Sequence, residues 1–177
     1  MVQPYLDAEE KPIIGSADFF SSHLNDWYRT ISGTNLEFTY QIALDDQGDG
    51  TYVYDNILFF PINGLGFGND IPQYPDYNYL FTSEFEMNFL YEPNQVFKFT
   101  GDDDLWIFIN GKLAIDLGGI HSSVSKEVNI DAFNEGNSLG MVWGEKYPMH
   151  IFHAERNPTQ SNFHIETSIG CFSSVII

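Results

Sequence analysis

The stretch that decides the fold is FKFTGDDDLWIFINGKLAIDLGGIH, residues 97–121. Two apolar runs in it, residues 105–109 and 112–117, are separated by Asn110 and Gly111. An Asn-Gly pair between apolar runs is the preferred two-residue hairpin turn, because both residues tolerate a positive φ angle. The stretch therefore predicts a β-hairpin. The side chains expected on one of its faces are Leu105, Ile107 and Ile109 from the first strand and Leu113, Ile115 and Leu117 from the second.

The rest of the chain alternates short apolar runs with turn residues. Helical periodicity is almost absent, and the best helix candidate is the segment 16–29, which Asp18 could cap. Strands are expected at residues 36–42, 52–60, 79–82, 86–91, 95–100, 124–130, 139–143, 147–153 and 162–169, with a long loop at 63–78 and an apolar tail at 170–177. Many short strands separated by turns indicate a β-sandwich or barrel.

Composition limits the class of protein and of partner. The 177 residues correspond to one domain, and a hydrophobic content of 43% is enough for a core. The 7 Lys and Arg against 25 Asp and Glu give a formal charge of −18, which repels phosphate backbones and makes a nucleic-acid partner unexpected. No apolar run is long enough for membrane insertion, and residues 1–12 are too polar for a signal peptide.

Three adjacent carboxylates, Asp102, Asp103 and Asp104, precede the hairpin. Neighbouring carboxylates repel one another, so a loop that holds them needs a cation or generous solvation. Calcium accepts six to eight oxygen ligands in flexible geometry, which suits carboxylates on one loop. If two adjacent aspartates reach one ion, the backbone between them must adopt an unusual conformation, such as a cis peptide, whose cost ion binding could offset. The alternative is an acidic turn capped by its own Asp side chains.

Four separated segments resemble the fibro-slime domain, a branch of the PA14-like β-sandwich family. They are residues 18–30, 50–69, 97–121 and 147–169, and they appear in the order of that family. The resemblance implies an all-β, PA14-like β-sandwich with long loops and at most one or two short helices. It also implies one domain over residues 1–177, with a core of about 16–170.

The resemblance further implies a calcium site. In PA14-like lectins two consecutive aspartates hold the ion, and by position these are Asp102 and Asp103. A second loop closes the site, and it falls on residues 155–162 with Asn162 and Gln160 as further metal ligands. Calcium in such a site keeps open positions that sugar hydroxyls can fill. The expected ligand-binding residues around it are Asp104, Asp116, Glu155 and Arg156.

Three functions are weighed on these grounds. The first is a non-enzymatic, calcium-dependent, extracellular or cell-surface module that binds or adheres to carbohydrate, such as a glycan or surface polysaccharide, or to surface proteins. The second is a structural module of a surface layer, in which calcium only makes loops rigid. The third is a glycoside hydrolase that uses Asp104 and Glu155, which would require the two carboxylates to flank a cleft with one pKa raised.

Two histidines, His150 and His153, raise the question of a zinc site. Positions three apart on a strand point to opposite faces, so these side chains cannot bind one ion. Glu155 shares the face of His153, but two groups make a poor zinc site. Zinc binding by these residues is therefore not expected.

Overall fold

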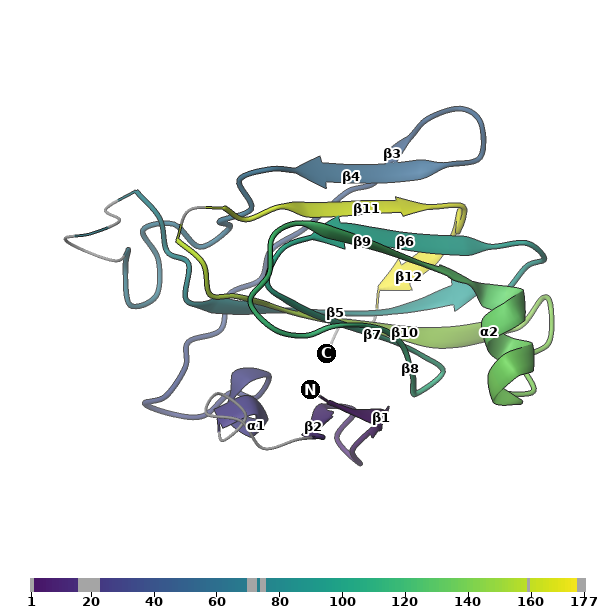
Figure 1. Ribbon diagram of the computed structural model, residues 1–177, viewed down its shortest axis with the longest axis horizontal. Helices are drawn as coiled ribbons and strands as arrows, with labels where there is room; N and C mark the ends of the chain where they lie inside the picture. The colour runs from purple at the N-terminus through teal and green to yellow at the C-terminus, as the bar shows by residue number, and fades with distance from the viewer. Residues whose placement is uncertain (1, 16–22, 70–72, 74–75, 159, 175–177) are drawn as a thin grey trace.

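The computed structural model describes residues 2–15, 23–69, 73, 76–158 and 160–174, which form two antiparallel sheets stacked as a sandwich (Figure 1). The seven-stranded sheet has the order β12 (Phe172–Ser174), β5 (Phe81–Leu90), β10 (Lys146–Glu155), β7 (Asp104–Ile109), β8 (Lys112–Leu117), β1 (Val2–Leu6) and β2 (Pro12–Ile14). The five-stranded sheet has the order β3 (Asp45–Asp46), β4 (Tyr52–Asn56), β11 (Phe163–Thr167), β6 (Val96–Gly101) and β9 (Val124–Asn129). Two short helices, α1 (Leu24–Trp27) and α2 (Ile130–Asn137), complete the described chain, so the all-β prediction is confirmed.

The predicted hairpin is formed by β7 and β8. Asn110 and Gly111 have φ angles of 49° and 73°, as a two-residue turn of this kind requires. The register is irregular between Ile107 and Phe108, so that Phe108 lies opposite Leu113. Leu113 therefore packs on the outer face of the sheet, and the prediction that it shares a face with the inward-facing residues of β8 is wrong.

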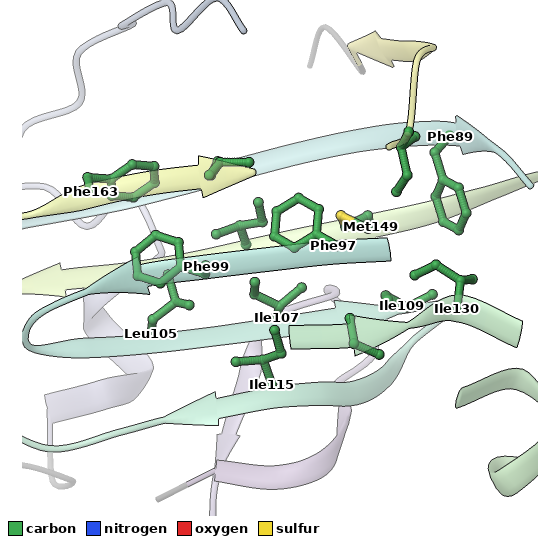
Figure 2. Close-up of a cluster of buried hydrophobic side chains, with 14 of the residues drawn as sticks. Phe89, Phe97, Phe99, Leu105, Ile107, Ile109, Ile115, Ile130, Met149 and Phe163 are labelled. Atoms are coloured by element: carbon green, nitrogen blue, oxygen red, sulfur yellow. The ribbon is translucent and has the colours of Figure 1, made fainter. Parts of the chain in front are cut away.

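Strand β7 is buried on both of its faces, and this explains its continuous apolar sequence. Leu105, Ile107 and Ile109 face the five-stranded sheet and lie in the core between the two sheets (Figure 2). Trp106 and Phe108 face the other way, in a second apolar cluster with residues of β1 and α1. The seven-stranded sheet is thus covered on one face by the other sheet and on its opposite face by N-terminal elements.

The central strands of the sandwich come from late in the sequence. In the seven-stranded sheet β10 lies between β5 and β7, and in the five-stranded sheet β11 lies between β4 and β6. Strand β10 pairs along its whole length with β5, from Lys146 opposite Leu90 to Glu155 opposite Phe81. Residues 79–82 and 86–91, expected as two strands, therefore belong largely to one continuous strand.

Two predicted strands are not formed. Residues 36–42 make no strand, and three of their large side chains are 43–55% exposed: Leu36, Phe38 and Tyr40. Residues 139–143 also make no strand; they follow helix α2, which begins after Asn129 accepts a hydrogen bond from the backbone N–H of Ala132 and ends at Ser138 in a left-handed conformation. Part of the tail forms β12.

The helix predicted at residues 16–29 is reduced in the described chain to α1, because residues 16–22 lie outside the described residues. Neither α1 nor α2 has the length and apolar character that a helix needs to span a bilayer.

Candidate functional site

Two chain segments cross between the sheets at the same end of the sandwich. The first crossing, Asp102 and Asp103, leaves β6 in the five-stranded sheet and enters β7 in the seven-stranded sheet. The second crossing, residues 156–158 and 160–162, returns from β10 to β11. The long loop between β4 and β5 lies at the same end (Figure 1). This arrangement brings residues that are more than fifty positions apart into contact.

The two crossings are joined by hydrogen bonds to the aspartates. The carboxylate of Asp102 accepts from the backbone N–H of Asn162 at 2.7 Å and from its side-chain amide at 2.5 Å. Asp103 Oδ2 accepts from the backbone N–H of Arg156 at 2.7 Å. Asp103 has a φ of 59°, a left-handed conformation that is costly for a residue other than glycine. The positive φ at Asp103 is one unusual backbone conformation beside the bond that joins the two aspartates.

Asp104 has a different set of partners from its two neighbours. Its Oδ2 accepts from Arg156 Nε at 2.6 Å and also pairs with Nη2 of the same guanidinium. Its Oδ1 accepts from the backbone N–H of Gly119. The guanidinium also lies 5.7 Å from the ring centre of Trp27. Because a two-point contact with arginine is among the strong charge-assisted pairs, Asp104 acts first as an anchor for Arg156.

The cluster holds more negative charge than its cation balances. Four carboxylates are at most 1% exposed: Asp102, Asp103, Asp104 and Glu155. Arg156 is the cationic side chain that pairs with them in the described part of the chain. Two oxygens, Asp103 Oδ1 and Glu155 Oε2, are buried and accept no hydrogen bond from the described residues. Since an unpaired buried charge costs several kcal/mol, the cluster must take up a proton or a cation.

The protonation of the cluster follows from its burial. Burial raises the pKa of Glu155 well above its usual range, and the neighbouring charge of Asp103 adds to the effect. Burial also raises the pKa values of Asp103 and Asp104, against the opposing hydrogen bonds from the backbone of Arg156 and Gly119 respectively. Asp103 and Glu155 influence each other's pKa, and protonation of one carboxyl group relieves the repulsion between them.

The donor types suit a hard cation, but no three carboxylates of this cluster bring ligand atoms within 4.8 Å of one another in the described chain. Asp103 and Glu155 each offer a buried open oxygen, and Asp102 keeps lone pairs beyond those used by Asn162. Calcium prefers carboxylate, amide and backbone oxygens, and a divalent charge would balance the excess of carboxylates. A cation bound at these residues would compete with a proton for the same oxygens.

The remaining predicted site residues lie outside this donor set. Gln160 is exposed, and its side chain hydrogen-bonds to none of the described residues. Asp116 accepts from Trp106 Nε1 and from the backbone N–H of Gly118, each at 3.0 Å. It thereby fixes the start of the segment that donates the Gly119 N–H to Asp104. Asp116 braces the cluster from outside.

A second group of side chains could also hold a metal ion. Glu10, Glu86 and His150 each place one ligand atom within 4.8 Å of the other two. Among the described residues, no other three His, Cys, Asp or Glu side chains bring their ligand atoms this close together. His153 packs on the opposite face against Phe59, Phe81 and Phe163. The prediction that His150 and His153 point to opposite faces of the strand is confirmed. What it missed is that His150 has two glutamates on its own face.

Comparison with known proteins places the chain in a family. It is 34% identical to Protein psiD of Dictyostelium discoideum over 96% of the chain and 36% of psiD. It is 37% identical to Protein psiQ over 94% of the chain and 17% of psiQ, and 36% identical to Protein psiC over 88% of the chain and 31% of psiC, both from the same organism. The chain thus spans about a third or less of these relatives. No solved structure matches it.

The PA14 domain model matches residues 60–172. This range runs from the start of the long loop to β12 and includes both crossings. The PA14-like prediction made from the sequence is therefore confirmed. With most of its length matched, including strands β5 to β11, the chain belongs to the PA14 domain family.

Proposed function

We propose that the chain is a non-catalytic, calcium-dependent binding or adhesion module that recognises carbohydrate outside the cell or at its surface. The observation that carries the proposal is the cluster of four buried carboxylates with two open oxygens and one paired arginine. Membership of the PA14 family supports a binding module. The aspartate pair that matches the calcium loop of PA14-like lectins supports carbohydrate as the ligand.

Each residue of the crossings has a defined part in this proposal. Asp102 and Asp103 would be the primary calcium ligands, with Glu155 and Asn162 completing the protein's share of oxygens. A bound calcium ion would neutralise the cluster and offer open coordination positions to a pair of sugar hydroxyls. The side chain of Arg156 is held by Asp104. This fixes the backbone N–H of Arg156, which donates a hydrogen bond to Asp103. The hydrogen bonds from Arg156 and Asn162 to the aspartates thereby hold the two crossings together.

The long loop between β4 and β5 is the candidate for the specificity of the site. It lies at the same end as the crossings (Figure 1) and exposes Leu65, Phe67 and Leu80 by 47%, 77% and 71%. Exposed apolar side chains beside a polar site are typical of ligand-binding surfaces, since they cover the apolar faces of a ligand. We therefore expect substitutions in this loop to change which ligand binds, with little effect on calcium.

The geometry gives less support to a glycoside hydrolase. Asp104 would have to act as acid or base, yet both of its oxygens are engaged by Arg156 and Gly119 and the side chain is fully buried. A carboxylate in a two-point contact with arginine is a poor proton carrier. The structural alternative, in which calcium only makes the crossings rigid, uses the same residues and is separated from the proposal by the second experiment below.

Calorimetric titration with calcium is the first test. The intact protein is compared with the D102N/D103N variant, which keeps the shape of both side chains. The matched control is D45N/D46N, which changes the adjacent, exposed aspartates of β3 and loses the same charge. We expect one saturable site per chain that is lost in D102N/D103N and retained in D45N/D46N. Equal binding by all three proteins would contradict the site.

An immobilised glycan panel, probed with and without calcium, is the second test. Calcium-dependent retention that is lost in D102N/D103N is the expected result. Saturable calcium binding without retention on any glycan would support the structural alternative. Retention that is unaffected by chelation would place the carbohydrate contact elsewhere on the molecule.

A further inference from the structure

The group formed by Glu10, Glu86 and His150 lies on the outer face of the seven-stranded sheet, on the side of the N-terminal hairpin. His150 on β10 is directly opposite Glu86 on β5 in the strand register. Glu10 belongs to the turn between β1 and β2, where it has a φ of 59°. His150 Nε2 is 3.9 Å from Glu86 Oε1 and 3.9 Å from Glu10 Oε2. Three elements that are distant in sequence thus direct ligand atoms to one point.

The imidazole of His150 makes no hydrogen bond with any of the described residues. The side chain is 1% exposed, and neither ring nitrogen has a hydrogen-bond partner among the described residues. One face of the ring is stacked near Phe152, with centroids 6.2 Å apart and planes within 6°. A buried polar group without a partner is unfavourable and calls for an explanation. A neutral imidazole nitrogen is also the commonest metal ligand in proteins.

The two glutamates of the group lack a cation of their own. The lysine and arginine nearest to this turn are engaged elsewhere: Lys11 pairs with Glu84, and Arg29 pairs with Asp7 and Glu9. In the described chain neither Glu10 nor Glu86 pairs with a lysine or arginine; each is paired only with His150. Two carboxylates and one imidazole therefore face one another, and neither glutamate has a lysine or arginine partner in the described chain.

We propose that Glu10, Glu86 and His150 form a binding site for a divalent transition metal of the zinc type. One imidazole nitrogen with two carboxylate oxygens suits zinc and its neighbours, whereas calcium takes oxygen ligands. Ligand atoms around tetrahedral zinc are about 3.4 Å apart. The observed separations are 3.9 Å from His150 to each glutamate and at most 4.8 Å between any two ligand atoms, so the group must close by up to about 1.4 Å around an ion. Glu10 is 60% exposed, which leaves room for water or another ligand on the outer side of the ion.

The site has a structural consequence for the N-terminal hairpin. A bound ion would join the β1–β2 turn to the middle of β5 and β10, beside the existing Lys11–Glu84 pair. The ion would then act as a cross-link that holds the hairpin over Trp106, Phe108 and Phe152. This proposal does not depend on the calcium site, because it uses other residues, another face of the sheet and another class of metal.

Zinc titration by calorimetry, in buffer that already contains saturating calcium, tests the site. The variants are E10Q, E86Q and H150F, and the matched control is E9Q, which removes a neighbouring carboxylate of the same turn that binds Arg29. We expect one zinc ion per chain in the intact protein and in E9Q. Removal of any ligand should weaken zinc binding by about tenfold or more, since loss of even an outer partner of a ligand costs that much.

Thermal unfolding supplies a second measurement, because an ion that binds only the folded protein raises its Tm. Zinc should raise the Tm of the intact protein and of E9Q but not that of E10Q. Glu10 is exposed, so E10Q and E86Q decide the question even if H150F does not fold. Zinc binding of unchanged strength in both E10Q and E86Q, or weakened equally in E9Q, would overturn the proposal.

Discussion

Gly101 is the residue at which the two crossings touch. A Cβ atom at this position would clash with the backbone carbonyl of Asn162 and with the ring of Phe99. The G101A variant should therefore push the second crossing outward and lose about 1–3 kcal/mol of unfolding free energy, the range seen when a packed site is overfilled. Urea denaturation followed by fluorescence measures this loss.

A second glycine offers a control of opposite sign. Gly136 lies inside helix α2, and a Cβ there meets nothing within 4 Å. The G136A variant should gain about 0.5–1 kcal/mol, because alanine favours the helix more than glycine does. An unchanged urea midpoint for G101A would contradict the close approach of the crossings.

The residues of the site were only partly predictable. Asp102 and Asp103 stood out because adjacent carboxylates are unusual, and Glu155 and Arg156 were named through the resemblance. Their separate roles could not be read from spacing. The pairing of Asp104 with Arg156, 52 positions away, depends on how the two crossings lie in space. Local sequence carries no information on that register.

At the scale of single elements, helix α2 is fixed by one carboxylate in its first turn. Asp131 accepts hydrogen bonds from the Tyr91 hydroxyl at 2.6 Å, the Asn94 backbone at 2.7 Å and Trp143 Nε1 at 3.2 Å. The hydrogen bond from Tyr91, with those from Asn94 and Trp143, lowers the pKa of Asp131. The helix is thereby tied to the turn between β5 and β6.

This anchor gives the fold a sensitivity to acid. The pKa of Asp131 is lower in the folded than in the unfolded chain, so its stabilisation is complete above the unfolded value of about 3.9 and is lost as pH falls through the folded value. The D131N variant should be less stable than the intact protein at pH 7, by less than about 1 kcal/mol for so accessible a group.

The difference between D131N and the intact protein should shrink as the pH falls below about 4. Urea midpoints over a pH series measure it, with D45N as a variant of an exposed aspartate outside such a network. A difference that stays constant from neutral to acid pH would show that ionised Asp131 is not the anchor.

Elements with a strong local signal were predicted well, and the others were not. Asn110 and Gly111 fixed the hairpin, but the irregular register beside Phe108 has no local signature. Helix α2 has eight residues and buries only Ile130, so it shows too little periodicity to be recognised. Residues 36–42 alternate like a strand, yet no neighbouring strand pairs with them in the described chain.

For the whole molecule, the dominant physical property is its charge of −18. Repulsion among surface carboxylates destabilises a compact chain. The repulsion reaches about 30 Å at an ionic strength of 0.01 M but only about 8 Å at 0.15 M, because salt screens it. The Tm should therefore rise when sodium chloride is raised between these concentrations. Calcium at constant ionic strength should add a further rise, because the buried cluster is little screened by sodium; magnesium serves as the control.

A Tm that falls with added salt would show that attractive pairs, such as that of Lys11 with Glu84, outweigh the repulsion. If calcium and magnesium raise the Tm equally, the effect is one of general charge. The rise in Tm that calcium causes beyond that of magnesium therefore measures the contribution of the buried cluster, as distinct from that of the surface charge.

The two-layer architecture was predictable from the number and spacing of apolar runs, but strand order was not. Neighbours such as β10 and β5 are paired although most of the chain between them lies elsewhere in the sandwich. The periodicity of a strand shows which face is buried and does not identify its partner. The pattern of strands alone allows either a sandwich or a barrel, and the family resemblance favours the sandwich.

The central places of β10 and β11 have a consequence for the time course of folding. Neither sheet can close until residues 146–167 are available, so at the ribosome the domain must wait until most of its chain has emerged. Until then the aspartates before β7 remain hydrated, and the negative charge that burial makes unfavourable has not yet been enclosed. Pairings of such long range fold slowly, on a scale of about milliseconds to seconds. We therefore expect the buried cluster to close late in folding, when a cation from the surroundings could still enter.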